Sequence, residues 1–353
     1  MCHLFIELSQ VHPVLDVRSP GEFLHAHIPR ALSLPLFTDE ERKVVGTAYK
    51  QQGKQAAIKL GLEYFGVKMR SMVEEVERIC GSFELENQPS TKRTILVHCW
   101  RGGMRSAGVA WLLDLYGYRV LTLIGGYKIY RNWVLDQFKE SYSFHVLGGY
   151  TGSGKTILLH ELEKRGAACI NLEALANHKG SALGALGEKR QPSQEMFENL
   201  LASALIKANA KEAGIYIEDE SQRIGNLQIP MPLWYTMRKM HVYFLDIPFE
   251  TRLDYITDEY SIHPKESIVE SIYRIQKRLG GLETKLAVQN ILEGNFKEGF
   301  RILLKYYDKY YTKGLNNRID AESLIHTMKV EGIHPDTNAN ILIENIKNTH
   351  GKN

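Results

Sequence analysis

The chain has 353 residues, of which 44% are hydrophobic and 24% are charged, and its formal net charge is +3. These proportions are typical of soluble globular proteins and exclude a disordered or fibrous chain. The chain is longer than one hydrophobic core usually serves, so we expect two domains. No stretch approaches the roughly 18 consecutive apolar residues of a membrane span, and the first residues lack the pattern of a signal peptide. We therefore expect a cytoplasmic protein with no membrane partner.

The four cysteines are widely spaced: Cys2, Cys80, Cys99 and Cys169. They form no CxxC pair, so neither a disulfide framework nor a zinc site is expected, and one reduced thiol is available for chemistry. The small net charge permits an RNA partner without requiring one. The basic pairs Lys189-Arg190 and Arg238-Lys239 either contact phosphates or are solvated surface, and a solvated surface is the favoured interpretation.

Apolar runs at 13–17, 94–98 and 120–124 predict three strands in the first part of the chain. Apolar residues at helical spacing predict helices at 70–80 and 106–116. This order of strands and helices is typical of an α/β domain with a parallel sheet.

A polar stretch near 136–142 precedes a new series of elements. Three further strands are predicted after it, at 144–147, 214–218 and 241–245. The sequence from about residue 249 onward is mostly helical and charged. We therefore predict two α/β domains, at 1–138 and 139–353, the second with a helical C-terminal part.

The segment HCWRGGMRS, residues 98–106, follows a predicted strand and opens a predicted helix. Backbone amides at a helix N-terminus, the positive end of its dipole and two guanidinium groups favour an anion at this point. The same field lowers the pKa of a cysteine thiol and makes the thiolate a nucleophile. We expect Cys99, Arg101 and Arg105 to be catalytic. The oxyanion loop around them is expected to comprise Trp100, Gly102, Gly103, Met104 and Ser106.

The pattern His-Cys-x5-Arg-Ser fits the signature of cysteine-dependent phosphatases, in which the cysteine is phosphorylated. The upstream segment LDVRSPGEF, residues 15–23, followed by His27-Ile28-Pro29, resembles the N-terminal hallmark of the rhodanese family, whose cysteine carries a persulfide. This resemblance implies a rhodanese-like fold for the first domain. Such folds include phosphatases with a loop of this length, so both chemistries stay open. Arg30 stands where the family usually has glycine.

The segment GYTGSGKT, residues 149–156, satisfies the pattern GxxxxGK[ST] between a predicted strand and a predicted helix. The backbone amides of such a P-loop wrap a diphosphate, the lysine neutralises its oxygens, and the threonine hydroxyl ligates Mg²⁺. The phosphate-binding residues are expected to be Gly149, Thr151, Gly152, Ser153, Gly154, Lys155 and Thr156.

The predicted strand at 214–218 ends in acidic residues, as the metal-organising strand of P-loop proteins does. We expect Glu218 or Asp219 to join Thr156 at Mg²⁺. The sequence has no guanine-recognition motif, which disfavours a GTPase, while ATP and a non-nucleotide diphosphate both stay open. Arg274 and Arg278 lie one predicted helical turn apart, and they either clamp a phosphate or belong to a surface helix that ends at glycine.

Six further segments carry a more specific likeness: Glu40-Glu41-Arg42, 45–53, Gly125-Gly126-Tyr127-Lys128, His178-Lys179-Gly180-Ser181, Gln194 with Phe197-Glu198-Asn199, and Glu218-Asp219-Glu220-Ser221. Together with a rhodanese-like half ahead of a P-loop half, they resemble the tRNA 2-selenouridine synthase family. The likeness extends from about residue 16 to about residue 278.

The resemblance implies a transferase that acts on the wobble 2-thiouridine of certain tRNAs. The 2-thio group is first alkylated by geranyl diphosphate and is then replaced by selenium from selenophosphate. A diphosphate donor suits a P-loop that lacks a nucleotide-specific motif. The anionic selenophosphate suits the loop at Cys99, which would accept the selenium as a selenenylsulfide. The order of these steps, and the domain that handles the geranyl group, are implied by the family alone.

Two alternative functions stay open. The first alternative is a rhodanese-type sulfurtransferase whose P-loop domain is regulated by a nucleotide. The second is a cysteine-dependent phosphatase fused to a small-molecule kinase.

Overall fold

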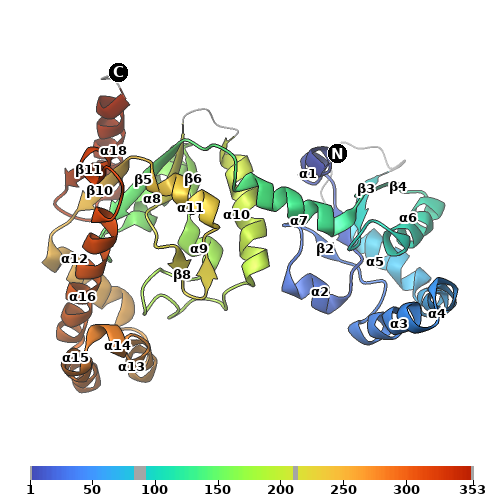
Figure 1. Cartoon of the computed structure of the whole chain (residues 1–353), viewed down its shortest axis with the longest axis horizontal. Coiled ribbons are helices and arrows are strands. Elements are labelled where there is room, and N and C mark those ends of the chain that lie inside the picture. Colours follow the sequence, from blue (N-terminus) through green and yellow to red (C-terminus); the bar gives the residue numbers. More distant parts are fainter. Residues whose placement is uncertain (1, 83–92, 210–213, 351–353) are drawn as a thin grey trace. The chain divides into compact units, whose positions relative to one another are not determined.

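The computed structural model describes residues 2–82, 93–209 and 214–350. The chain divides into two compact units, Met1–Asp136 and Gln137–Asn353 (Figure 1), where the sequence predicted a boundary after residue 138. Within the described ranges, no helix is long and apolar enough to cross a membrane.

The first unit is built on a four-stranded parallel sheet. Its strands are β1 (Val14–Asp16), β2 (Leu32–Ser33), β3 (Thr94–His98) and β4 (Arg119–Thr122), in the order β2-β1-β3-β4. β1 and β3 are buried along their whole length because helices cover both faces of a parallel sheet. The strand order reverses between β1 and β3, and ligands of open α/β sheets bind at such a switch point.

Seven helices are described in this unit: α1 (Cys2–Leu8), α2 (Pro20–His25), α3 (Asp39–Gln51), α4 (Lys54–Gly66), α5 (Met69–Ser82), α6 (Met104–Tyr116) and α7 (Gly126–Gln137). Val76 of α5 and Val109 of α6 pack with Leu15 and Val97 in one hydrophobic cluster. The two helices that the sequence predicted at 70–80 and 106–116 therefore pack their apolar faces against the sheet.

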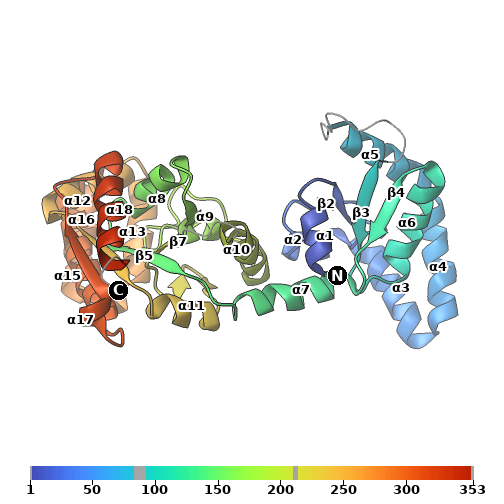
Figure 2. The same cartoon turned by 90° about the horizontal axis from the view of Figure 1, so that it is seen from above.

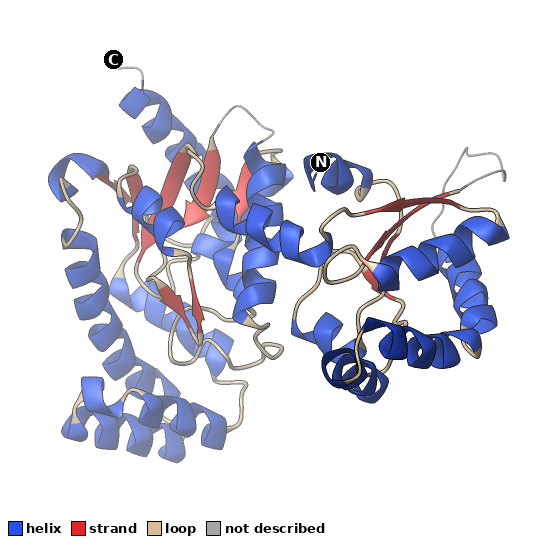
Figure 3. Cartoon of the chain, turned by 45° about the vertical axis from the view of Figure 1, so that its right-hand side comes forward, coloured by secondary structure: helices blue, strands red, loops and turns tan. Residues whose placement is uncertain are grey.

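The second unit is built on a five-stranded parallel sheet (Figure 3). Its strands are β5 (Phe144–Gly149), β6 (Ala168–Ile170), β7 (Ile215–Glu218), β10 (Val242–Asp246) and β11 (Ile325–Lys329), in the order β11-β10-β5-β7-β6. A short antiparallel ribbon joins β8 (Arg223–Ile224) to β9 (Leu227–Gln228). β5 lies at the centre of the sheet, so its carboxyl end is the natural ligand site.

Eleven helices are described in the second unit: α8 (Lys155–Lys164), α9 (Leu172–Ala176), α10 (Gln194–Asn209), α11 (Met231–Arg238), α12 (Phe249–Tyr260), α13 (Lys265–Arg274), α14 (Gln276–Leu279), α15 (Gly281–Glu293), α16 (Phe296–Asn316), α17 (Ala321–Leu324) and α18 (Pro335–His350). α8 and α18 lie side by side on one face of the sheet (Figure 2), where Leu159 and Leu342 share a core with Leu245. In the sequence between β10 and β11, the helices α12, α13, α15 and α16 form a separate hydrophobic core around Phe300. This is the helical C-terminal part that the sequence predicted.

Candidate functional site

Cys99 lies where β3 ends and the chain turns toward α6. The turn packs closely against Gly126 at the start of α7, where a Cβ atom would lie 2.3 Å from the carbonyl oxygen of Cys99. The amide of Tyr127 donates to that carbonyl at 2.8 Å, and the amide of Lys128 donates to the carbonyl of Trp100 at 3.0 Å. These bonds hold the turn against α7, and the amides of Arg101, Gly103 and Ser106 face the sulfur.

The Cys99 side chain forms the floor of this loop and is only 3% exposed, beneath exposed residues 100–104. Burial raises the pKa of the thiol, but polar donors outweigh it. The hydroxyl of Ser106 lies 3.2 Å from Sγ, and the amides of Ser106, Gly103 and Arg101 also favour the thiolate, so the pKa of Cys99 is lowered overall. The sulfur is therefore in a polar cradle although its residue is buried.

The two arginines of the loop have different surroundings, and only Arg105 departs from what the sequence predicted. Arg101 is exposed, and Arg105 donates to the carboxylate of Glu22 at 2.9 Å, which also accepts from Arg42 at 2.9 Å. Burial of Glu22 acts to raise its pKa, but the two guanidinium groups hold that pKa at about 2. Glu22 thus takes up the charge of Arg105, and amides together with Ser106 act on the sulfur. The expected role of Arg101 stays a prediction. Glu22 was assigned no role at this site from the sequence, although the residue lies in the rhodanese-like segment 15–23.

A buried ion pair packs against Tyr127, the residue whose amide donates to the carbonyl of Cys99. Arg18 Nη2 lies 2.6 Å from Asp16 Oδ2, and the guanidinium stacks 3.8 Å from the centre of the Tyr127 ring. His98 lies beside the same ring, and burial lowers its pKa to about 4. His98 is therefore neutral near pH 7 and adds no positive charge to the cysteine. Arg30 has φ +70°, so it keeps the left-handed conformation that the rhodanese family's glycine would favour.

Replacing Ser106 with alanine is expected to raise the pKa of Cys99 by about one unit, because a hydrogen bond to the thiolate is lost while burial remains. The rate of alkylation by iodoacetamide, followed against pH by mass spectrometry, reports the change as a half-rise at higher pH. Ser71→Ala, on the exposed surface of α5, is the control. An unchanged profile in Ser106→Ala contradicts the role of this hydroxyl.

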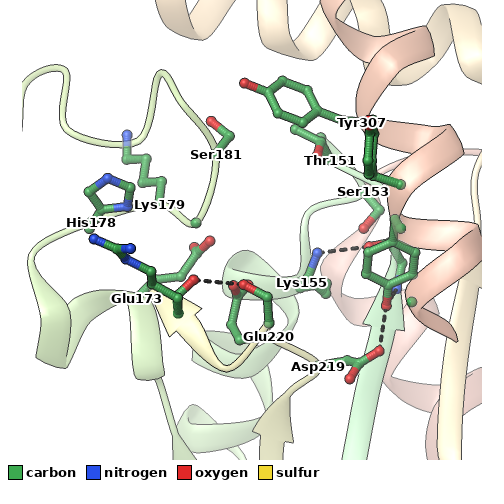
Figure 4. Close-up of a pocket in the computed structure, with 18 of the residues that line it drawn as sticks. Thr151, Ser153, Lys155, Glu173, His178, Lys179, Ser181, Asp219, Glu220 and Tyr307 are labelled. Carbon is green, nitrogen blue, oxygen red and sulfur yellow. Dashed lines mark hydrogen bonds between the residues drawn. The ribbon is translucent and has the colours of Figure 1, made fainter. Parts of the chain in front are cut away.

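The P-loop joins β5 to α8, as the pattern predicted. Gly152 and Gly154 have φ of +80° and +70°, and a Cβ atom on Gly152 would lie 3.0 Å from the carbonyl oxygen of Arg252. Lys155 Nζ donates to the carbonyl of Gly149 at 2.9 Å, across the mouth of the loop. Ser153 lies on one side of Lys155 (Figure 4), and Glu173 and Glu220 lie on the other. The loop therefore has the curvature and the cation that a phosphate requires.

Two carboxylates meet the hydroxyl of Thr156. Its Oγ1 lies 3.1 Å from Glu173 Oε2 and 3.1 Å from Glu218 Oε1. Burial, and then the neighbouring Glu173, raise the pKa of Glu218 to about 7. In the part of the chain that the structure describes, no group of three or more His, Cys, Asp or Glu could hold a metal alone. Mg²⁺ usually takes one or two protein oxygens and completes its shell with phosphate and water, so Thr156 and Glu218 fit it.

Asp219 does not join this group, which corrects one of the two expected Mg²⁺ ligands. Its Oδ1 accepts from Arg318 Nη2 at 2.6 Å, and its Oδ2 accepts from the hydroxyl of Tyr311 at 2.8 Å. Successive side chains at the end of a strand point to opposite faces, so Glu218 and Asp219 do not reach one ion. Tyr311 in turn accepts from the amide of Gly149 at 3.1 Å, so Asp219 supports the P-loop instead.

A second brace ties the P-loop to α16. Arg252 is 2% exposed; its Nη2 lies 2.7 Å from Asp308 Oδ2, and its Nη1 donates to the carbonyl of Thr151 at 3.1 Å. Asp308→Asn is expected to lower the free energy of unfolding by about 3 kcal/mol, because it leaves a buried guanidinium without its anion. Urea denaturation measures this loss. Glu298→Gln, at an exposed pair with Arg301, should cost less than about 1 kcal/mol, and an equal cost would contradict the brace.

Arg274 and Arg278 are not on one continuous helix, which corrects the predicted spacing. α13 ends at Arg274, Ile275 interrupts the helix, and Arg278 lies in the short α14. Both arginines nevertheless line the same cavity as the P-loop, which has a volume of about 1310 Å³. Thr151, Gly152, Ser153, Gly154 and Lys155 line it as well. The structure thus brings the predicted phosphate residues together, with Glu173 and Tyr311 as neighbours that the sequence did not indicate.

Comparisons with known proteins agree with this arrangement. A rhodanese-like domain model matches residues 4–132, and a model of the tRNA 2-selenouridine synthase AAA domain matches residues 142–331. A tRNA 2-selenouridine synthase from Sulfurovum sp. is 35% identical, over 85% of this chain and 87% of its own length. Those from Nitrosomonas europaea and Bdellovibrio bacteriovorus are 36% and 32% identical, over 82% and 90% of this chain and 73% and 95% of their own lengths. With both of its units matched in order, the chain belongs to the tRNA 2-selenouridine synthase family.

Proposed function

We propose that this protein acts in the cytoplasm on tRNA and replaces the sulfur of wobble 2-thiouridine by selenium, using geranyl diphosphate and selenophosphate. The observation that carries the proposal is the presence of two anion sites of different chemistry in one chain of this family. One holds a thiol of lowered pKa at Cys99, and the other holds Lys155 in a glycine-rich loop.

The P-loop cavity is assigned the geranyl transfer. The diphosphate of the donor lies on the amides of 149–156, and Lys155 neutralises the charge that develops as it leaves. The C–O bond of the geranyl group breaks, a C–S bond forms to the 2-thio group, and the N3 proton of the base is lost to water. Mg²⁺, when held by Thr156 and Glu218, would stabilise the leaving diphosphate. A volume of about 1310 Å³ is sufficient for a prenyl diphosphate together with a base.

The loop at Cys99 is assigned the activation of selenophosphate. If Cys99 accepted selenium as a selenenylsulfide, the phosphorus would leave as phosphite, and a reductant would be needed to release the selenium as selenide. Attack of the thiolate on phosphorus, as in cysteine-dependent phosphatases, needs no reductant, so this step is preferred. The thiolate attacks phosphorus, the P–Se bond breaks, and selenium leaves as hydrogen selenide. Hydrogen selenide then attacks C2 of the geranylated base, a C–Se bond forms and geranylthiol leaves. Water hydrolyses the S–P bond, which releases phosphate and restores Cys99.

Reconstitution tests the proposal directly. The purified protein is incubated with tRNA that carries wobble 2-thiouridine, first with geranyl diphosphate and Mg²⁺ and then with selenophosphate, and digested nucleosides are analysed by mass spectrometry. The expected products are a geranylthio nucleoside and then a selenonucleoside. Thiosulfate sulfurtransferase activity with tight ATP binding and unchanged tRNA would instead support the nucleotide-regulated sulfurtransferase. Rapid hydrolysis of aryl phosphates that depends on Cys99 would support the phosphatase fused to a kinase.

A further inference from the structure

The cavity that contains the P-loop is lined by basic side chains without carboxylate partners. Apart from Lys155, six of them form no ion pair with any residue that the structure describes: Arg223, Arg238, Lys239, Arg274, Lys277 and Arg278. Other cations of the same cavity are paired, since Lys179 lies 2.7 Å from Glu259 and Arg318 lies 2.6 Å from Asp219. The whole chain carries a net charge of only +3, so six unpaired cations around one cavity are a local excess of positive charge.

The carboxylates of the cavity do not neutralise this group. Asp219 and Glu259 are held by the ion pairs just described, and Glu188 lies 3.6 Å from the same Lys179. Glu173 and Glu220 lie against Gly180, where a Cβ atom would be 2.9 Å from an oxygen of each, on the Lys155 side of the cavity. Arg274, Lys277 and Arg278 are exposed at the ends of α13 and α14, and Lys239 is exposed after α11. The excess positive charge therefore faces solvent and suits a polyanion.

Exposed aromatic rings accompany these cations. Tyr310 is 46% exposed and lies beside Tyr306, with the ring centres 4.7 Å apart and the ring planes tilted by 50°. Tyr235 is 53% exposed on α11, next to Trp234, over which the guanidinium of Arg238 lies at 5.5 Å. Cations that follow a backbone and rings on which bases stack are the two components of single-stranded nucleic acid sites. A duplex would offer its phosphates but no unstacked base to these rings.

We propose that this rim, comprising the six unpaired cations with Tyr235 and Tyr310, binds the single-stranded anticodon loop of the tRNA. The inference rests on the proposed function and adds the surface that holds the substrate. Phosphates of the loop contact Arg238 and Lys239 on one side and Arg274, Lys277 and Arg278 on the other. The unstacked base then enters the cavity toward Lys155. Arg274 and Arg278 are thereby assigned to RNA phosphates rather than to the diphosphate donor.

A charge-matched pair of triple variants tests the phosphate contacts. Arg274→Gln/Lys277→Gln/Arg278→Gln removes three cations of the rim. Lys305→Gln/Lys309→Gln/Lys313→Gln removes three exposed cations from α16 that do not line the cavity. Fluorescence anisotropy measures the binding of the full-length protein to a labelled anticodon stem-loop across KCl concentrations. For the rim variant we expect at least about 10-fold weaker binding near 0.15 M KCl, and a slope of log K against log[KCl] that is shallower by about 2. The α16 variant should bind as the unmodified protein does.

Tyr310→Leu tests the stacking contact separately. Loss of one base–aromatic stack is expected to weaken binding about 10-fold while leaving the salt slope unchanged. A hairpin of the same length, closed by a compact tetraloop, offers no unstacked base and should show no difference between the variant and the unmodified protein.

The outcomes separate this inference from the proposed function. Full affinity and an unchanged salt slope in the rim variant overturn the inference, even if the protein still modifies tRNA. Equal losses in both triple variants overturn it as well, because they indicate a non-specific charge effect. If the unmodified protein does not bind the stem-loop at all and gives no modified nucleoside, the proposed function itself fails.

Discussion

Cys99→Ser is expected to abolish selenium incorporation into tRNA, by at least about 10³-fold, while geranylated tRNA accumulates. The serine hydroxyl remains protonated near pH 7, whereas the cradle of Ser106 and three amides lowers the pKa of the cysteine thiol. The change leaves the P-loop unit intact, so only the second step is lost. Mass spectrometry of digested tRNA from a deletion strain that expresses the variant measures both nucleosides.

The matched control for this variant is Cys169→Ser, which changes a half-buried thiol in β6, within the other unit. It should give the selenonucleoside at the level of the unmodified protein. Wild-type amounts of selenonucleoside in Cys99→Ser would refute the role of this sulfur. A loss of both nucleosides would show that the cysteine also serves the geranyl transfer.

Lys155→Met should slow geranyl transfer by about 10² to 10³-fold, because a preorganised charge at the leaving diphosphate is removed. The same variant should lose the stabilisation that geranyl diphosphate gives against thermal unfolding, which is about 2.7 kcal/mol at 100 times the dissociation constant. Single-turnover assays with thiolated tRNA and thermal shift measurements test the two effects. Incorporation of selenium into tRNA that is already geranylated should continue.

Lys164→Met, at the exposed end of the same helix, is the control and should behave as the unmodified protein does. The assay also identifies the ligand of the P-loop. Protection by ATP with none by geranyl diphosphate would contradict the assignment of a prenyl diphosphate to this cavity.

The periodicity of the sequence predicted most strands because buried parallel strands are continuous apolar runs. β3 coincides with the predicted run at 94–98, and β5 and β7 begin within a residue of their predicted starts. β2, β6, β8 and β9 were not predicted, because strands of two or three residues are too short for a periodic signal. β11 was also missed, because it is an edge strand in which His326, Thr327 and Lys329 are polar or charged. An edge strand with one covered face lacks the apolar signal on which the prediction depended.

The two anion loops were predictable because their residues are consecutive in the chain. Their supporting partners come from far along the sequence: Glu22 reaches Arg105 from 83 positions away, and Tyr311 reaches Asp219 from 92. Local spacing carries no information about such contacts. The same limit explains why Asp219 was predicted to be a metal ligand. Its ion-pair partner, Arg318, lies far along the chain, and local spacing gives no sign of it.

The hydrogen bonds and the ion pair of α16 determine how the P-loop acquires its shape. Tyr311 accepts from the amide of Gly149, and Asp308 holds the arginine that donates to the carbonyl of Thr151, so one helix that begins at Phe296 anchors the first half of the P-loop at two points. A polypeptide truncated after β10 would retain all residues of the P-loop, 149–156, but would lose the helix whose contacts shape it. The capacity to grip an anion at this turn is thus a property of residues more than a hundred positions downstream.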